Sequence, residues 1–165
     1  MWAAFIIAFV VAVAFSDILW RKVPRHLTVV AFAAGVIFHA VFGGLLSAIT
    51  AILVASVLGV AFFRVGAIGG GDVKLLIALG AILGLRDWLI AMQIAVFCAA
   101  FVALVQVLRR GLFVQTARNL MELIRGIFRN GLRGHETIHV RNPLAVRAPF
   151  GFAAAVGTIL VVVRP

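Results

Sequence analysis

Acidic residues and cysteine are scarce in this chain, and both shortages limit the chemistry open to it. Only 5 of its 165 residues are Asp or Glu, and charged residues of all kinds make up 12%, against 65% hydrophobic residues. A soluble domain of this length needs far more polar surface, so the composition predicts a polytopic helical membrane protein. Cys98 is the only cysteine. Its isolation excludes an internal disulfide and any multi-cysteine zinc site.

Six apolar segments give the chain its organisation. They cover residues 2–19, 27–42, 45–63, 73–85, 88–108 and 148–163. We therefore expect one all-α membrane domain over residues 1–165, with six transmembrane helices. The fourth segment is short for a span, so we expect it either to start deep in the membrane or to use the three glycines before it as irregular buried backbone. No basic n-region or small-residue cleavage site precedes Asp17, so we interpret the first segment as a retained span.

The basic residues lie between the predicted spans, and their distribution gives an orientation. Of the 15 Lys and Arg residues, all but Arg86 and Arg164 fall on one side of the membrane. The positive-inside rule makes that side cytoplasmic and places the N-terminus outside. We therefore assign the net charge of +10 to topology and to contact with anionic membrane lipid, and not to nucleic-acid binding.

A long basic loop, residues 108–147, joins the last two predicted spans on the cytoplasmic side. Apolar residues recur within it at helical spacing, namely Leu120, Leu123, Ile124, Ile127 and Phe128. Another face of the same segment carries Arg118, Glu122, Arg125 and Arg129. This pattern predicts an amphipathic helix that lies in the membrane interface with its cations toward the lipid headgroups.

Two aspartates are the only acids at the predicted cytoplasmic ends of the apolar segments. Asp17 closes the first predicted span and Asp72 opens the fourth, so both are expected at the cytoplasmic ends of their helices. A carboxylate at membrane depth is costly, and such residues usually serve a function. Two carboxylates that share a site do not easily both ionise, so one can activate water while the other donates a proton. This is the arrangement of an aspartic protease.

Each aspartate also has a structural interpretation. Asp72 could cap the fourth helix after the glycine stretch, and Asp17 could pair with Arg21 one helical turn away. Lys74 is expected to extend toward the membrane surface. The matching depth of the two aspartates favours a joint function over two separate structural roles.

The residues around both aspartates form motifs, and a third motif opens the last apolar segment. They are Asp17-Ile18-Leu19-Trp20-Arg21-Lys22-Val23-Pro24, Gly69-Gly70-Gly71-Asp72-Val73-Lys74-Leu75 and Pro149-Phe150-Gly151. In this order they resemble the signatures of the prepilin peptidases: an aspartate followed by a basic pair and an Ile/Val-Pro turn, a Gly-x-Gly-Asp, and a Pro-aromatic-Gly. The resemblance covers nearly the whole chain. Arg25 departs from it, because Asn more often follows the proline in that family.

The resemblance implies an intramembrane aspartic endopeptidase of the bacterial inner membrane. By matching position, Asp17 and Asp72 would be the catalytic pair, with no metal or other cofactor. The supporting motif residues would be Gly69, Gly71, Lys74 and Pro24. The implied substrate is a prepilin, which carries a short basic leader peptide before an apolar helix and is cut on the cytoplasmic side. The small size and the lack of an N-terminal cysteine-rich domain resemble the short form that serves Flp/Tad-type pili, for which we expect no methylation activity.

Other functions stay open. His135-Glu136-Thr137-Ile138-His139 fits the HExxH pattern of zinc proteases, which requires a helix that turns both imidazoles toward one metal. The β-branched residues in this stretch, and Asn142-Pro143 after it, disfavour a helix there. A proton relay through Asp17 and Asp72 in a transport subunit is a further alternative, although mid-span polar residues are few. The last alternative is a subunit of a pilus assembly that has no catalytic activity.

Overall fold

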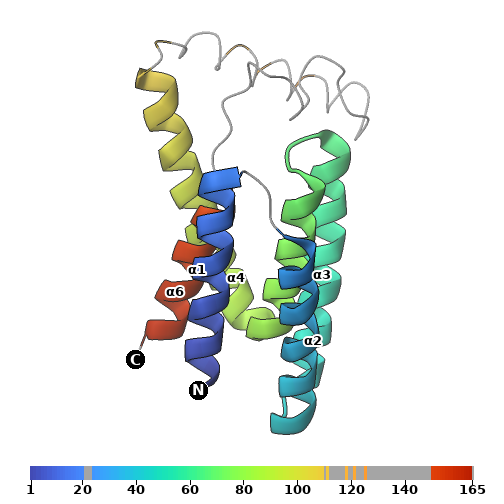
Figure 1. Cartoon of the computed structure of the whole chain (residues 1–165). Coiled ribbons are helices and arrows are strands. Elements are labelled where there is room, and N and C mark those ends of the chain that lie inside the picture. The colour runs from blue at the N-terminus through green and yellow to red at the C-terminus, as the bar shows by residue number, and fades with distance from the viewer. Residues whose placement is uncertain are drawn as a thin grey trace.

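The computed structural model describes residues 1–20, 24–109, 111, 118, 121, 125 and 150–164. Within these residues the chain is helical, with no strand. The helices are α1 (Trp2–Trp20), α2 (Arg25–Phe42), α3 (Leu45–Val65), α4 (Gly70–Arg109) and α6 (Phe150–Val163). Figure 1 shows them gathered in one bundle, with both chain termini at the same end. In the part of the chain described, α1 to α4 are long and apolar enough to cross a membrane, and α6 is a shorter apolar helix of 14 residues.

The predicted segments correspond to these helices in different ways. The first three match α1, α2 and α3 to within two residues at each end, and all three qualify as spans. The fourth and fifth correspond to the two parts of α4 on either side of a break at Gly84, and the sixth to α6, which has only 14 residues, so the described residues do not confirm six spanning helices. The interfacial helix predicted from Leu120, Leu123, Ile124, Ile127 and Phe128 lies outside the described residues.

The expectation of irregular backbone at the three glycines is wrong for two of them. Helix α4 begins at Gly70, so Gly70 and Gly71 form its first residues and only Gly69 precedes it. The reason is local. The Asp72 carboxylate accepts a hydrogen bond from the Gly69 N–H at 3.0 Å. Such a bond closes the first turn and offsets the low helix propensity of glycine.

Helix α4 folds back on itself at Gly84, which has a φ of 72° and a ψ of 172°. The indole Nε1 of Trp88 donates a hydrogen bond to the carbonyl of Leu76 at 3.0 Å. In a straight helix these two residues would lie about 18 Å apart along the axis, at 1.5 Å per residue. The two arms of α4, residues 70–83 and 85–109, therefore run in opposite directions, as Figure 1 shows.

Side chains from α2 and α3 stabilise this break in α4. His39 Nε2 donates to the carbonyl of Ile82 at 3.2 Å, and the N–H of Leu85 donates to Ser47 Oγ at 2.9 Å. A helix break leaves backbone groups without their helical partners, and a lipid bilayer cannot hydrogen-bond them. The two contacts satisfy one such carbonyl and one such N–H, which allows the chain to reverse there.

Gly84→Ala is expected to lower the free energy of unfolding by about 1–3 kcal/mol, because that backbone conformation is almost restricted to glycine. The added Cβ would also lie 2.9 Å from Ser47 Oγ. Gly43→Ala is the matched control, since Gly43 has a φ of 88° but no neighbour within 4 Å of its added Cβ. Thermal unfolding in detergent should show the larger loss for Gly84→Ala. An equal loss would mean that the contact with Ser47 has no effect.

Small residues let the helices around α4 approach closely. Helix α4 packs against α2, α3 and α6, whereas α1 packs mainly against α6. A Cβ added at Gly157 in α6 would overlap the carbonyl oxygen of Ala91 in α4. Close contacts of this type are the usual means by which membrane helices associate. Helix α6 thereby touches both α1 and α4, and this places its first turn at the end of α1.

Candidate active site

Asp17 lies near the C-terminal end of α1 and is only 8% exposed. Its Oδ2 accepts a hydrogen bond from the backbone N–H of Gly151 at 2.7 Å, across 134 residues of sequence. Gly151 is the second residue of α6, and the first N–H groups of a helix have no partner within it. The start of the last described helix therefore provides a donor for the buried carboxylate of Asp17.

The glycine at position 151 is needed for this contact because a side chain would not fit. A Cβ built there would lie 2.9 Å from Asp17 Oδ2 and 3.1 Å from Asp17 Cγ. Carbon atoms at such a separation are in steric conflict. Any other residue at this position would push α6 and the carboxylate apart, so Gly151 sets how closely they meet.

Asp72 is the third residue of α4 and is half-buried. Its Oδ2 accepts the Gly69 N–H, and the N–H groups of Asp72 and Val73 donate in turn to the Gly69 carbonyl, at 3.1 and 3.2 Å. The structural role considered for Asp72, that of a helix cap, is thus present in the structure. The capping geometry differs from that of an ordinary N-cap residue, which directly precedes the helix. Asp72 is in the first turn of α4, and its carboxylate accepts the N–H of Gly69, which precedes the helix.

The turn before Asp72 is also well defined. Gly66 ends α3 with a φ of 80°, and the N–H groups of Gly66 and Ala67 donate to the Phe63 and Phe62 carbonyls. This is the Schellman pattern that commonly ends a helix. Because one helix stops and the next starts within a few residues, the Asp72 side chain is held between two fixed helix ends.

The fold brings Asp17 and Asp72 to the same end of the bundle. The end of α1 and the beginnings of α4 and α6 all lie toward the upper side of Figure 1. Both carboxylates therefore lie at the end of the bundle where α1 ends and where α4 and α6 begin. Each also has one oxygen held by a backbone N–H. The arrangement is a fixed pair of carboxyl groups at one end of a largely apolar helical bundle.

A sequence profile of the type IV leader peptidase family matches residues 4–104. The match covers well over half of the chain and includes both aspartates. The chain belongs to the type IV leader peptidase family. Membership implies prepilin leader peptidase activity, and the apolar helices α1 to α4 agree with a multi-pass membrane protein. No curated protein and no solved structure matches the chain.

The other motif residues of this leader peptidase have simpler surroundings. Pro24 directly precedes α2 in extended backbone, with a φ of −61° and a ψ of 129°, as is typical of the residue just before a helix. Gly71 and Lys74 are exposed, and a Cβ added at Gly71 would meet nothing within 4 Å. The pairing of Asp17 with Arg21 concerns a residue outside the described part of the chain.

Gly151 is the residue at this site whose contact the sequence did not indicate. It stands in the Pro-Phe-Gly motif, outside the range matched by the family profile. A glycine at the start of an apolar helix suggests a close contact at that position, but nothing in the sequence says which side chain the glycine contacts. Among the described residues no group of three His, Cys, Asp or Glu side chains could hold a metal. The HExxH stretch, residues 135–139, lies outside them.

Proposed function

We propose that this leader peptidase is an intramembrane aspartic endopeptidase in which Asp17 and Asp72 form the catalytic pair. Its substrates would be Flp-type prepilins, cut at the cytoplasmic face of the bacterial inner membrane. The two arms of α4 and the short helix α6 would complete a six-span topology, with the N-terminus outside. That topology follows from the basic residues between the spans, which face the cytoplasm under the positive-inside rule.

The observation that carries this proposal is the shared position of two carboxyl groups, each anchored through one oxygen. Gly151 holds Asp17 and Gly69 holds Asp72, both through backbone N–H groups. A catalytic group must be held in its productive geometry, because a displacement of about 1 Å can cost roughly 10²-fold in rate. Two purely structural carboxylates would have no reason to lie at the same end of a largely apolar bundle, each held by a backbone N–H.

The mechanism follows from the interaction between the two groups. Mutual repulsion favours the state in which one carboxyl group is protonated and the other ionised. The ionised group takes a proton from water as the water oxygen attacks the scissile carbonyl carbon, and the protonated group donates a hydrogen bond to the carbonyl oxygen. A tetrahedral intermediate forms. Proton transfer to the amide nitrogen then lets the carbon–nitrogen bond break and releases the leader peptide.

Substrate presentation also fits the position of the pair. A prepilin has a basic leader followed by an apolar helix, and that helix can lie in the bilayer beside α1 to α4. The leader junction then lies at the membrane boundary, where Asp17 and Asp72 are found under the proposed topology. The +10 charge of this chain does not attract a basic leader, so recognition depends on local contacts and on the apolar helix.

A zinc protease and an aspartic protease differ in their sensitivity to the loss of a histidine and to a metal chelator. We expect His135→Ala to process a co-expressed Flp-type prepilin like the wild type, and we expect a metal chelator to leave cleavage in purified membranes unchanged. Leader removal is read from the mobility of the prepilin on a gel. A zinc protease would need both imidazoles and its metal, so loss of cleavage in either condition would replace the aspartic mechanism by the metal-dependent one.

A further inference from the structure

A cavity of about 410 Å³ lies at the end of the bundle opposite the aspartates. Its walls are the first turn of α1, the last turn of α2, the break in α4 and the end of α6; we call it the Trp2 cavity. Trp2 lies about 22 Å along α1 from Asp17, at 1.5 Å per residue. The Trp2 cavity is therefore separate from the candidate active site, and the proposed cleavage does not use it.

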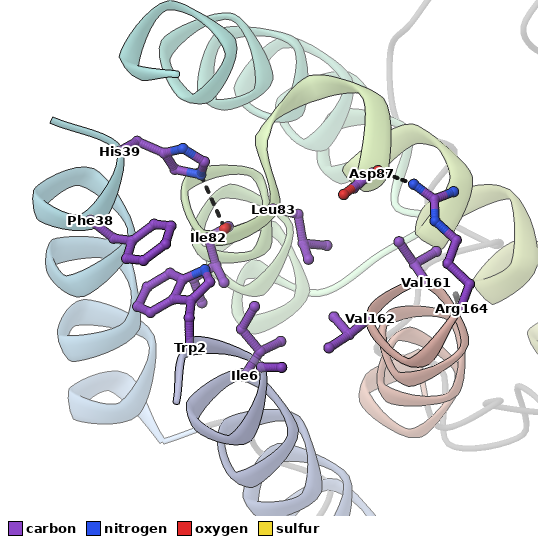
Figure 2. A pocket seen from close by; sticks show the side chains of 11 residues that line it. Trp2, Ile6, Phe38, His39, Ile82, Leu83, Asp87, Val161, Val162 and Arg164 are labelled. Carbon is purple, nitrogen blue, oxygen red and sulfur yellow. Dashed lines mark hydrogen bonds and ion pairs between the residues drawn. The ribbon is translucent and has the colours of Figure 1, made fainter. Parts of the chain in front are cut away.

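Most of the Trp2 cavity is apolar. On one side Trp2 stacks against Phe38, with ring centroids 3.9 Å apart and parallel planes. Figure 2 shows the aliphatic side chains of Ile6, Leu83 and Val162 between this aromatic pair and the opposite wall. An apolar interior of this size is typical of small-ligand sites, which span about 300–1,000 Å³. The interior would accept a hydrocarbon group.

The opposite wall carries two charges. Asp87 in α4 and Arg164 after α6 form an ion pair, drawn at the right of Figure 2. Their side chains are 41% and 39% exposed, so a ligand can reach both. A simple anion would be attracted by Arg164 and repelled by Asp87, and the reverse holds for a simple cation. A ligand with both charges a short distance apart would complement the pair.

The Trp2 cavity lies where the helices end. Helix α1 begins at Trp2, α2 ends at Phe42 and α4 reverses at Gly84. For spans of this length the helix ends lie at the level of the lipid headgroups, which is also where tryptophan collects in membrane proteins. The molecule that surrounds the protein at this level, and that carries both charged and apolar parts, is a phospholipid.

We propose that the Trp2 cavity binds a zwitterionic phospholipid with a primary ammonium group, of the phosphoethanolamine class. The phosphate contacts Arg164, the ammonium contacts Asp87, and the glycerol and upper acyl chain cover the apolar interior. A primary ammonium donates charge-assisted hydrogen bonds to a carboxylate. A choline headgroup has no N–H to donate, and a phosphoglycerol headgroup has no positive charge for Asp87.

Native mass spectrometry of the purified full chain tests this assignment. The protein is incubated with an equimolar mixture of phosphatidylethanolamine, phosphatidylcholine and phosphatidylglycerol of the same acyl length, and the retained lipid is identified. We expect one phosphatidylethanolamine to be retained about 10-fold more than the other two, the effect of one hydrogen bond to a charged group. Asp87→Asn should abolish that preference, and Arg164→Gln should reduce retention of all three lipids.

Arg86→Gln is the matched control, because Arg86 is an exposed cation next to Asp87 that does not line the cavity. It should keep the preference for phosphatidylethanolamine. Water-soluble phosphoethanolamine at the same concentration should not displace the lipid, since it lacks the apolar part. Equal retention of the three lipids by the wild type, or an unchanged preference in Asp87→Asn, would overturn the proposal. Displacement by phosphoethanolamine would show that the ligand is not the whole lipid.

Discussion

Asp17→Asn and Asp72→Asn should each reduce prepilin cleavage by at least about 10²-fold, the usual contribution of one acid or base group. Asparagine keeps the size of the side chain and can still accept the backbone N–H of Gly151 or Gly69, so the fold should be retained. What is lost is the ability to exchange a proton. The measurement is the rate of leader removal from a purified Flp-type prepilin in detergent or vesicles.

The double variant separates a catalytic pair from two independent residues. Groups that act as a unit are strongly non-additive, so Asp17→Asn/Asp72→Asn should be scarcely slower than either single variant. Asp87→Asn is the control, because Asp87 lies at the opposite end of the bundle in an exposed ion pair. Its cleavage rate should equal that of the wild type. Cleavage that survives the loss of either Asp17 or Asp72 would rule out the aspartic mechanism.

Gly151→Ala is expected to reduce the turnover number by about 10²-fold, as a small misplacement of a catalytic group does. The added methyl group would lie within 3.1 Å of three atoms of the Asp17 side chain. The carboxylate must move, and its 2.7 Å bond to the Gly151 N–H lengthens. KM should change little, since Gly151 touches the catalytic group and not the substrate. Steady-state cleavage kinetics separate the two constants.

A variant on the same helix distinguishes this effect from general damage. Gly157→Ala crowds the contact between α6 and Ala91 in α4, so its main cost should appear as a lower melting temperature. At a temperature where both variants are folded, Gly157→Ala should keep a turnover number near that of the wild type while Gly151→Ala does not. If both variants lose activity in proportion to their loss of stability, Gly151 has only a structural role.

The helices were the most predictable part of this protein. Apolar runs of 16 to 19 residues bounded by charges or glycines gave α1, α2 and α3 almost to the residue, because hydrophobic length alone decides whether a segment can cross a bilayer. The same reasoning separated the two arms of α4 near Arg86, although the backbone itself breaks at Gly84. The reversal there depends on His39 and Ser47, which lie far away in sequence and could not be connected to it beforehand.

The sequence indicated which two acidic residues the candidate site contains, but it did not indicate the hydrogen bonds that hold them. Because acids are so rare in this chain, Asp17 and Asp72 stood out, and the alternation of spans placed them at one depth. Their catalytic role stays a prediction. The Pro149-Phe150-Gly151 motif singled out Gly151, but nothing in the sequence indicated its bond to Asp17, because the bond joins residues 134 positions apart. The start of α4 at Gly70 was not predicted, because glycine has a low helix propensity. The hydrogen bond from the Gly69 N–H to the Asp72 carboxylate stabilises the first turn in spite of that propensity.

The contact between α1 and α6 also bears on how the protein is made. Asp17 and then Asp72 leave the ribosome before the backbone donor of Asp17, which follows Asp17 by 134 residues. A nascent chain that has inserted α1 to α4 holds both aspartates and lacks the group that orients one of them. If cleavage depends on Gly151, a chain that stops before residue 151 is inactive, and proteolysis begins only when α6 has entered the membrane.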